Sequence, residues 1–360
     1  MSSLRILIAG GGTGGHILPA LAVARELVEQ HSAEVLFVGT ARGMESSLVP
    51  EAGFSLRLID VGQLKNVSLL TKLRTLLDLP RSFFACRKLI REFRPDVVFG
   101  VGGYASGPAM ASALWLKIPA MAFEPNAVPG LANRLVGKRV QAAAVNFPSA
   151  AAWFRNAEVT GIPVRREFFT LAAPTAPHLL VFGGSQGARL FNEHLPRIAP
   201  ALLDAVPGLT VLHQSGAHHF QQTQAAYAAS GADPKRWQVK PFLDDMPQQF
   251  ARASLVMARS GASTVAELAA AGKPALLVPF AAAADDHQRR NAGEMVKAGA
   301  ALMLDETELE VPGKLLAALT SLLKSPAGLA AMAAAARTQA HPDAARRIAS
   351  RLAALAHPTA

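Results

Sequence analysis

The sequence predicts an α/β protein of two doubly wound, Rossmann-like parallel-sheet domains that face each other across a cleft. Short apolar strands alternate with glycine turns and helical segments along the first half, which is the order typical of a parallel sheet covered by helices. The same order begins again near residue 178, where another apolar strand enters a second glycine-rich turn. A chain of 360 residues is also long enough to form two separate cores.

The strands of the first half are expected where short apolar runs precede turns, at residues 4–9, 34–38, 96–100, 119–123 and 142–145. Helices are expected over about 19–30 and 109–116. Because each strand is almost wholly apolar, we expect both faces of the sheet to be covered.

The second half repeats the pattern, with strands expected at 178–182, 209–213, 237–240, 254–258 and 275–279 and a helix over 190–203. Three prolines between residues 161 and 177 interrupt the periodicity, so the boundary between the domains is expected there. The alanine-rich segment 328–355 is expected to form a closing pair of helices.

Composition limits the possible partners and compartments. The single cysteine, Cys86, cannot form an internal disulfide, which favours a reducing compartment. No secretory signal or spanning helix is expected, since glycines and prolines interrupt the apolar runs at 4–9 and 101–116. A formal charge of +10 implies an anionic partner, whether nucleic acid, a phosphate ligand or a membrane surface.

Glycine-rich turns follow strands at Gly10–His16 (GGGTGGH), Gly102–Pro108 and Gly183–Arg189. Such a turn lets a ligand approach the backbone at a helix start, although it is also common as tight packing alone. The first matches the dinucleotide fingerprint G-x-G-x-x-G, which needs an acidic residue at the end of the second strand. Here no carboxylate follows that strand until Glu45, which weakens a dinucleotide site without removing it.

The second half carries polar residues after its later strands. The segment 260–267 (SGASTVAE) is typical of a helix start that binds a diphosphate. Glu267 then either accepts hydrogen bonds from a ribose or only interacts favourably with the helix dipole. Asp285, Asp286, His287, Gln288 and Asn291 form a further candidate cluster. In the first loop, His16 is either a general base or a residue that packs at the helix start.

A basic stretch at 68–94 combines cations with more leucine and phenylalanine than one buried helix face requires, and Pro80 is expected to divide it into two helices. It is either an ordinary surface helix pair or an interfacial membrane-binding segment. The candidate membrane-contacting residues are Leu69, Leu70, Lys72, Leu73, Arg74, Leu77, Arg81, Phe83 and Phe84.

Seven motifs occur in order along nearly the whole chain: GGGTGGH (10–16), GVGGYASGP (100–108), EPNAVPG (124–130), GIPVR (161–165), GGSQGAR (183–189), ARSGASTVAEL (258–268) and DDHQRRNA (285–292). Together they closely resemble the MurG family of bacterial glycosyltransferases. The resemblance implies transfer of GlcNAc from UDP-GlcNAc to the C4 hydroxyl of the MurNAc of lipid I, which gives lipid II with inversion. It also implies that no metal and no cofactor is required.

The resemblance further implies a GT-B fold with an acceptor and membrane-associating domain (1–162), a UDP-GlcNAc-binding domain (163–335) and a final helix that returns to the first domain (336–360). It implies a donor site made of Thr13, Gly14, Gly15, Asn126, Arg165, Ser185, Leu243, Ala262, Ser263, Thr264, Val265, Ala266, Glu267 and Gln288. In that site Ser185 and the N–H groups near Ser263 and Thr264 hold the diphosphate, Glu267 the ribose, the backbone around Leu243 the uracil, and Gln288 with Asn126 the sugar. The implied location is the cytoplasmic face of the inner membrane, on its anionic surface, with no nucleic-acid partner.

The chain departs from the family where Phe123 and Pro125 replace a usual histidine and glutamine. His16 is therefore the first candidate base and Glu124 the second. Three other interpretations stay open: a glycosyltransferase with another lipid acceptor such as a diacylglycerol, a dinucleotide-dependent oxidoreductase, and a non-enzymatic basic adaptor for membranes or nucleic acid.

Overall fold

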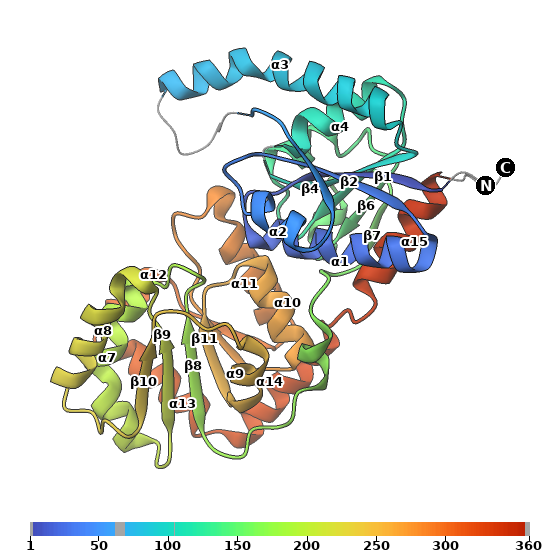
Figure 1. The fold of residues 1–360 in the computed structure, drawn as a ribbon. Coiled ribbons are helices and arrows are strands. Elements are labelled where there is room, and N and C mark those ends of the chain that lie inside the picture. Colours follow the sequence, from blue (N-terminus) through green and yellow to red (C-terminus); the bar gives the residue numbers. More distant parts are fainter. Residues whose placement is uncertain (1–2, 62–68, 104, 357–360) are drawn as a thin grey trace. The chain divides into compact units, whose positions relative to one another are not determined.

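The computed structural model describes the backbone of residues 3–61, 69–103 and 105–356, and their side chains apart from those of 69–79. The chain divides into two compact units (Figure 1). Unit 1 comprises Met1–Pro163 and His341–Ala360, and unit 2 comprises Val164–Ala340. The first division, after Pro163, lies within the proline-containing segment 161–177. Each unit is described separately, and the expectation that the two face each other across a cleft stays a prediction.

The described part of unit 1 forms a seven-stranded parallel sheet in the order β3-β2-β1-β4-β5-β6-β7. Its strands are β1 (Arg5–Gly10), β2 (Glu34–Gly39), β3 (Ser55–Leu58), β4 (Val97–Gly102), β5 (Ala120–Glu124), β6 (Ala142–Val145) and β7 (Ala157–Val159). Its helices are α1 (Gly14–His31), α2 (Glu45–Glu51), α3 (Leu69–Phe93), α4 (Ser106–Trp115), α5 (Leu131–Val136), α6 (Pro148–Ala151) and α15 (Ala344–Ala356). β4 is buried along its whole length, as expected of a central parallel strand.

Unit 2 forms a six-stranded parallel sheet in the order β10-β9-β8-β11-β12-β13 within the described residues. Its strands are β8 (His178–Phe182), β9 (Thr210–Gln214), β10 (Trp237–Lys240), β11 (Leu255–Ala258), β12 (Ala275–Leu277) and β13 (Ala301–Met303). Its helices are η1 (Arg166–Thr170), α7 (Arg189–Ala205), η2 (Ala217–His219), α8 (Phe220–Ala229), α9 (Met246–Arg252), α10 (Ala262–Ala271), η3 (Ala284–Asp286), α11 (His287–Lys297), α12 (Glu306–Leu309), α13 (Lys314–Leu323) and α14 (Pro326–Thr338).

The alanine-rich end of the chain forms two helices, as predicted, and they belong to different units. α14 packs on α10 in unit 2, whereas α15 packs against α1 in unit 1 (Figure 1). Ile348 and Leu352 of α15 are fully buried. An ion pair between Arg347 and Glu158 of β7, 2.8 Å long, also ties α15 to this unit.

The prediction that Pro80 divides two helices was wrong. α3 runs without a break from Leu69 to Phe93 and contains Pro80. A proline inside a helix removes one backbone hydrogen bond and clashes with the preceding turn, at a cost of about 3 kcal/mol. Packing on α4 offsets this cost, because Cys86 and Ile90 are both 1% exposed in the core of unit 1.

Other differences concern the ends and edges of elements. α1 begins at Gly14, five residues before the predicted start near Pro19, and accommodates Pro19 inside the helix. The edge strands β3, β7 and β13 were not predicted; they have only three or four residues each, too few to show a periodicity.

Among the described residues, no single helix has the length and hydropathy to cross a membrane, and one bent pair, α13 with α14 at 87°, meets the criterion only when taken together.

Candidate active site

The order of the strands marks where each unit is expected to bind a ligand. In unit 1 the order reverses between β1 and β4, and in unit 2 between β8 and β11. In open parallel sheets, ligands bind beyond the carboxyl ends of the strands at such a switch point. The predicted loops Gly10–His16 and Gly102–Pro108 follow β1 and β4, and Gly183–Arg189 and the 260–267 segment follow β8 and β11. These four motifs therefore lie at the switch points of the two sheets.

The first loop is pressed closely against the end of β4. Gly10, Gly11 and Gly12 all have positive φ angles, of 143°, 143° and 95°. The N–H of Gly11 donates to the carbonyl of Gly102 at 3.2 Å, and a side chain on Gly103 would overlap the carbonyl of Gly11. Glycine is needed here because two backbones approach each other with no room for a Cβ atom.

This loop brings four of the predicted residues to one place. Thr13 is the exposed N-cap of α1, and Gly14 and Gly15 form the first turn of the helix. His16 follows, half-buried, with its ring against Gly102: a Cβ atom on that glycine would lie 2.8 Å from Cε1 and 2.9 Å from Nδ1 of the imidazole. His16 is therefore held between the helix start and the end of β4, at the position where a ligand is expected.

Sequence reasoning noted Glu45 only as a carboxylate too late for a dinucleotide site. In the structure Glu45 is 1% exposed and points inward. It accepts hydrogen bonds from the backbone N–H of Gly12 at 2.6 Å and of Thr40 at 2.8 Å. A carboxylate buried on protein donors is not available to a ribose, so the structure gives the dinucleotide interpretation no support.

Glu124 is the last residue of β5, the strand next to β4, and Asn126 lies two residues beyond its end. The Glu124 side chain is 2% exposed and accepts from Asn126 N, Asn126 Nδ2, Gly130 N and Asn133 Nδ2 at 2.9–3.2 Å. Burial raises the pKa of this carboxyl, and the hydrogen bonds from Asn133, Asn126 and Gly130 oppose that shift. These donors hold the 124–130 turn, which is the environment of a structural carboxylate rather than of a base that meets a substrate hydroxyl.

In unit 2, the Gly183–Arg189 loop is exposed at its tip. Gly184, Ser185 and Gln186 are all exposed. The side-chain amide of Gln214, at the end of β9, donates to the carbonyl of Gly184 at 3.0 Å. Ser185 thus lies on an open loop directly before α7, where the helix N-terminus favours an anion.

The segment 262–267 forms the first turns of α10, after Gly261 as N-cap. The Val265 N–H is the first to donate within the helix, to Gly261 O at 3.0 Å, so the N–H groups of Ala262, Ser263 and Thr264 precede the regular helical bonds. Val265 is buried, while Ser263, Thr264 and Ala266 are partly exposed. The predicted helix start is confirmed, and anion binding at it stays a prediction.

Glu267 lies further along α10 and is partly exposed. Desolvation raises its pKa to about 7, and the nearby positive charge of Arg165 partly opposes the shift. Arg165 itself is exposed, with its guanidinium over the ring of Phe168 at 5.1 Å from the centroid. The structure therefore brings Arg165 and Glu267 together, although they are far apart in the sequence. Perturbed pKa values of this kind concentrate at functional sites.

Gln288 is tied to the loop after β11. Its backbone carbonyl accepts from Ser260 Oγ at 2.8 Å, and its side-chain Oε1 accepts from Phe280 N at 3.0 Å. The buried Asn291, one turn later on α11, donates from Nδ2 to Ser260 O at 3.2 Å. The start of α11 is thereby held beside the start of α10. The two aspartates before it, Asp285 and Asp286, both have left-handed backbone, with φ of 55° and 54°.

Leu243 follows β10 with its side chain only 3% exposed. Because this side chain is buried, the uracil contact that the resemblance implies here would be made by the backbone, and it stays a prediction.

Arg259 is a residue of this region to which sequence reasoning gave no role. It is 9% exposed and forms a 2.5 Å ion pair with Glu306. Its guanidinium also donates to the carbonyls of Val278 and Pro279 at 3.1 Å. Burial lowers the pKa of Arg259, and Glu306 opposes this shift. The pair supports the loop that leads to Gln288. Its only sequence signal was a charged residue inside the ARSGAST motif.

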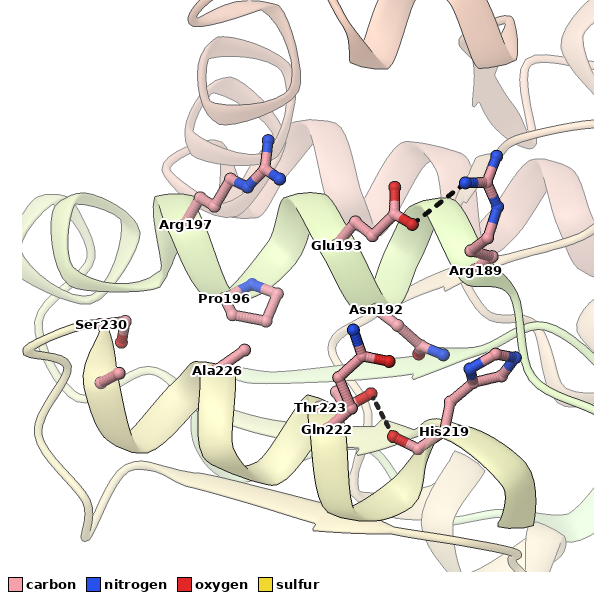
Figure 2. Close-up of a pocket in the computed structure, with 11 residues that line it drawn as sticks. Arg189, Asn192, Glu193, Pro196, Arg197, His219, Gln222, Thr223, Ala226 and Ser230 are labelled. Atoms are coloured by element: carbon pink, nitrogen blue, oxygen red, sulfur yellow. Dashed lines mark hydrogen bonds and ion pairs between the residues drawn. The ribbon is translucent and has the colours of Figure 1, made fainter.

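A separate groove lies between α7 and α8, and none of the predicted donor residues lines it (Figure 2). It is lined by Arg189, Arg197 and His219 with several neutral polar groups, and Arg189 pairs with Glu193 across one turn of α7 at 3.2 Å. Apart from Arg189, which ends the glycine loop, the groove shares no residue with the predicted motifs.

Of the candidate membrane residues, Leu69, Leu70, Lys72, Leu73, Arg74 and Leu77 have side chains outside the described residues. Arg81 and Phe84 are exposed, and Phe84 keeps 58% of its surface accessible. Phe83 packs edge-on against Phe84 and against Trp115 of α4, whose side chain is 71% exposed. Exposed aromatic rings and cations thus lie together on α3 and α4.

Comparisons with known proteins agree with the architecture and with the motifs. The glycosyltransferase family 28 N-terminal domain matches residues 6–145, and the glycosyltransferase family 28 C-terminal domain matches residues 178–348. A solved calicheamicin glycosyltransferase, at 17% identity and a TM-score of 0.71 over 100% of both chains, shares the fold alone.

Nearer relatives extend over almost the full length. A protein of Anaeromyxobacter dehalogenans is 45% identical over 355 residues, 96% of this chain and 91% of the relative. One of Solibacter usitatus is 44% identical over 98% of this chain and 96% of the relative. Both are named UDP-N-acetylglucosamine--N-acetylmuramyl-(pentapeptide) pyrophosphoryl-undecaprenol N-acetylglucosamine transferase. The crystal structure of Acinetobacter baumannii MurG superposes with a TM-score of 0.80 at 30% identity, over 97% of this chain and 99% of that one. The chain belongs to the MurG family, within glycosyltransferase family 28, and has its GT-B fold.

Proposed function

We propose that this protein transfers GlcNAc from UDP-GlcNAc to the MurNAc of lipid I, the step that forms lipid II in peptidoglycan synthesis. The observation that carries the proposal is the 45% identity, over 96% of the chain, to a relative named for this reaction. The site geometry supports it, because four of the seven motifs of the family lie at the switch points of the two sheets.

Unit 2 supplies most of the donor site in this proposal, and Thr13, Gly14, Gly15 and Asn126 of unit 1 complete it. The free N–H groups at the start of α10 and the exposed Ser185 bind the diphosphate of UDP-GlcNAc. Glu267 accepts hydrogen bonds from the ribose, the backbone near Leu243 meets the uracil, and Gln288 with Asn126 contacts the sugar. Desolvation raises the pKa of the Glu267 carboxyl, and the positive charge of Arg165 partly opposes that shift, so Arg165 helps to keep the ionised acceptor form that a ribose needs.

Unit 1 supplies the base. The imidazole of His16 takes the proton from the C4 hydroxyl of MurNAc, and the hydroxyl oxygen attacks the anomeric carbon of GlcNAc. A new C–O bond forms on one face while the bond to the diphosphate breaks on the other, so the configuration inverts. The negative charge that develops on UDP is stabilised by the N–H groups of α10.

The same proposal includes peripheral binding to the cytoplasmic face of the inner membrane, where lipid I is anchored. It is supported by the exposed Phe84 and Trp115 beside Arg81 on unit 1, because an aromatic and basic surface favours an anionic interface. A double variant, Phe84→Ser with Trp115→Ser, should lower co-sedimentation with anionic vesicles. Leu135→Ser, at another exposed apolar position of unit 1, is the control.

The decisive experiment is product analysis after incubation with labelled UDP-GlcNAc and a lipid I analogue. A labelled disaccharide lipid is the expected product. Parallel incubation with diacylglycerol tests the rival acceptor, and labelled glycolipid formed from it but not from lipid I would overturn the proposal.

A further inference from the structure

Glu45 has no part in the proposed reaction, yet its surroundings are formed around its carboxylate. Oε2 accepts from Gly12 N at 2.6 Å, and Oε1 accepts from Thr40 N at 2.8 Å and from Thr40 Oγ1 at 3.0 Å. The side chain comes from the first residue of α2 and is 1% exposed. One buried carboxylate therefore accepts from all three donors. Hydrogen bonds to a charged acceptor are stronger than those between neutral groups.

Three glycines from different segments make room for this carboxylate. Gly11 lies in the loop after β1, Gly39 ends β2, and Gly43 precedes α2. A Cβ atom built on any of them would overlap the side chain of Glu45. The space between the carboxyl ends of β1 and β2 therefore admits the Glu45 side chain and leaves no room for further side-chain atoms.

The contact with Gly12 fixes one side of the glycine loop. On the other side, Gly11 N donates to Gly102 O at 3.2 Å, and the His16 ring rests against Gly102. α1 begins only two residues after Gly12. Glu45 and β4 thus clamp the loop from opposite sides, and the clamp determines where α1 starts and where His16 is held.

We propose that Glu45 is a positioning residue for the transfer reaction, which acts on His16 by holding the Gly10–His16 loop. This inference rests on the proposed function for its effect on catalysis, whereas its effect on the loop is independent of any reaction. Glutamine cannot replace the carboxylate fully, because one of its two terminal atoms is a donor. Keeping both Thr40 bonds places that NH2 group opposite the N–H of Gly12, so Glu45→Gln releases the loop.

The first measurement compares steady-state kinetics of Glu45→Gln with Glu51→Gln, an exposed glutamate at the end of the same helix. We expect kcat of Glu45→Gln to fall about 10- to 100-fold, since small displacements of a reacting group cost that much. The Kd for UDP should stay within about twofold, because the residues proposed to hold the diphosphate, the ribose and the uracil all lie in unit 2. Glu51→Gln should behave as wild type.

A double-mutant cycle tests whether Glu45 acts through His16. In a His16→Ala background, Glu45→Gln should lower kcat by less than about twofold further, since a group that acts through another loses its effect when that group is absent. Multiplicative losses in the double variant would overturn the inference, as would a Glu45→Gln enzyme with wild-type kcat.

Hydrogen exchange separates this inference from the proposed function. In Glu45→Gln the amides of residues 10–16 should exchange faster, while those of β8 stay protected; unchanged exchange in residues 10–16 would overturn the inference even in a protein without transferase activity. Should Glu45→Gln not fold, Thr40→Val removes only the 3.0 Å hydroxyl bond, and it should raise exchange in the same segment to a smaller extent. If wild type forms no lipid II, the proposed function fails, and the exchange result still decides the role of Glu45.

Discussion

The two glycine-rich loops look alike in sequence and differ in what surrounds them. Gly10–His16 is clamped between a buried carboxylate, Glu45, and the end of β4. Gly183–Arg189 is held at its base, where the backbone at Gly187 lies in close contact with the backbone at Gly216. Its tip, residues 184–186, is exposed. The carboxylate of Glu45 thus fills the space beside the first loop, whereas the tip of the second loop is exposed to solvent. A glycine turn at a helix start can therefore hold a side chain in place, as Gly10–His16 does, or leave its tip exposed, as Gly183–Arg189 does.

The largest expected effect tests the function of the clamped loop. His16→Ala should lower kcat by about 10²- to 10⁴-fold, the contribution typical of a general base, with little change in the Kd for UDP. Turnover is measured at saturating concentrations of both substrates. His31→Ala, at the other end of α1, is the control. Near-normal turnover of His16→Ala would remove the histidine as base.

The next largest expected effect concerns unit 2, the unit whose glycine-rich loop has an exposed tip. Glu267→Gln should weaken UDP binding about 10- to 100-fold, since a hydrogen bond to a charged group contributes roughly 1.5–3 kcal/mol. Calorimetric titration with UDP measures it, with the exposed Glu310→Gln as control. Removal of the ribose hydroxyls from the ligand should reduce the difference between variant and wild type. If Glu267→Gln lost as much affinity for the ligand without ribose hydroxyls as for UDP, Glu267 would not be the residue that binds the ribose.

The pH dependence of stability follows from the same residue. The pKa of Glu267 in the folded protein is raised to about 7 from 4.5, so folding favours its neutral form. The contribution of the protonated carboxyl to the free energy of unfolding is complete below pH 4.5. It amounts to about 1–3 kcal/mol and is lost as the pH rises through 7. The difference in unfolding free energy between Glu267→Gln and wild type should therefore grow from pH 5 to pH 8. A constant difference over that range would contradict the shift.

Two glycines allow a matched test of the clamp. Gly102 and Gly184 have similar positive φ angles, of 92° and 87°, so alanine is strained about equally at both, by roughly 1–2 kcal/mol. A Cβ atom at Gly102 would meet the His16 ring at 2.8 Å, whereas none of the described atoms lies within 4 Å at Gly184. Gly102→Ala should therefore lower the unfolding free energy by about 1–3 kcal/mol more than Gly184→Ala. Equal melting temperatures would show that the first loop is not tightly packed.

The smallest expected effect is that of chelation. If helix N-termini stabilise the leaving group, addition of EDTA should change kcat by less than about twofold. A loss of activity that magnesium restores would contradict this mechanism and would assign the charge on the diphosphate to a metal.

Several features were determined by the sequence alone. The central strands, the restart near residue 178 and the positions of the glycine loops follow from apolar runs and turn residues, which are local patterns. The ordered motifs identified the family for the same reason, since each lies within one short segment. The three short edge strands and the continuity of α3 through Pro80 were missed, because strand pairing and helix packing decide them.

Only the tertiary structure decided how separate segments meet. It placed Glu45 beneath the first loop, surrounded Glu124 with donors, brought Arg165 to Glu267 and joined Arg259 to Glu306. The pKa values of these groups depend on burial and on neighbours that are distant in the chain, neither of which spacing along the sequence can reveal. Glu45, which carried no sequence signal for the first glycine loop, accepts a hydrogen bond from Gly12 of that loop, because two adjacent parallel strands bring their carboxyl ends together.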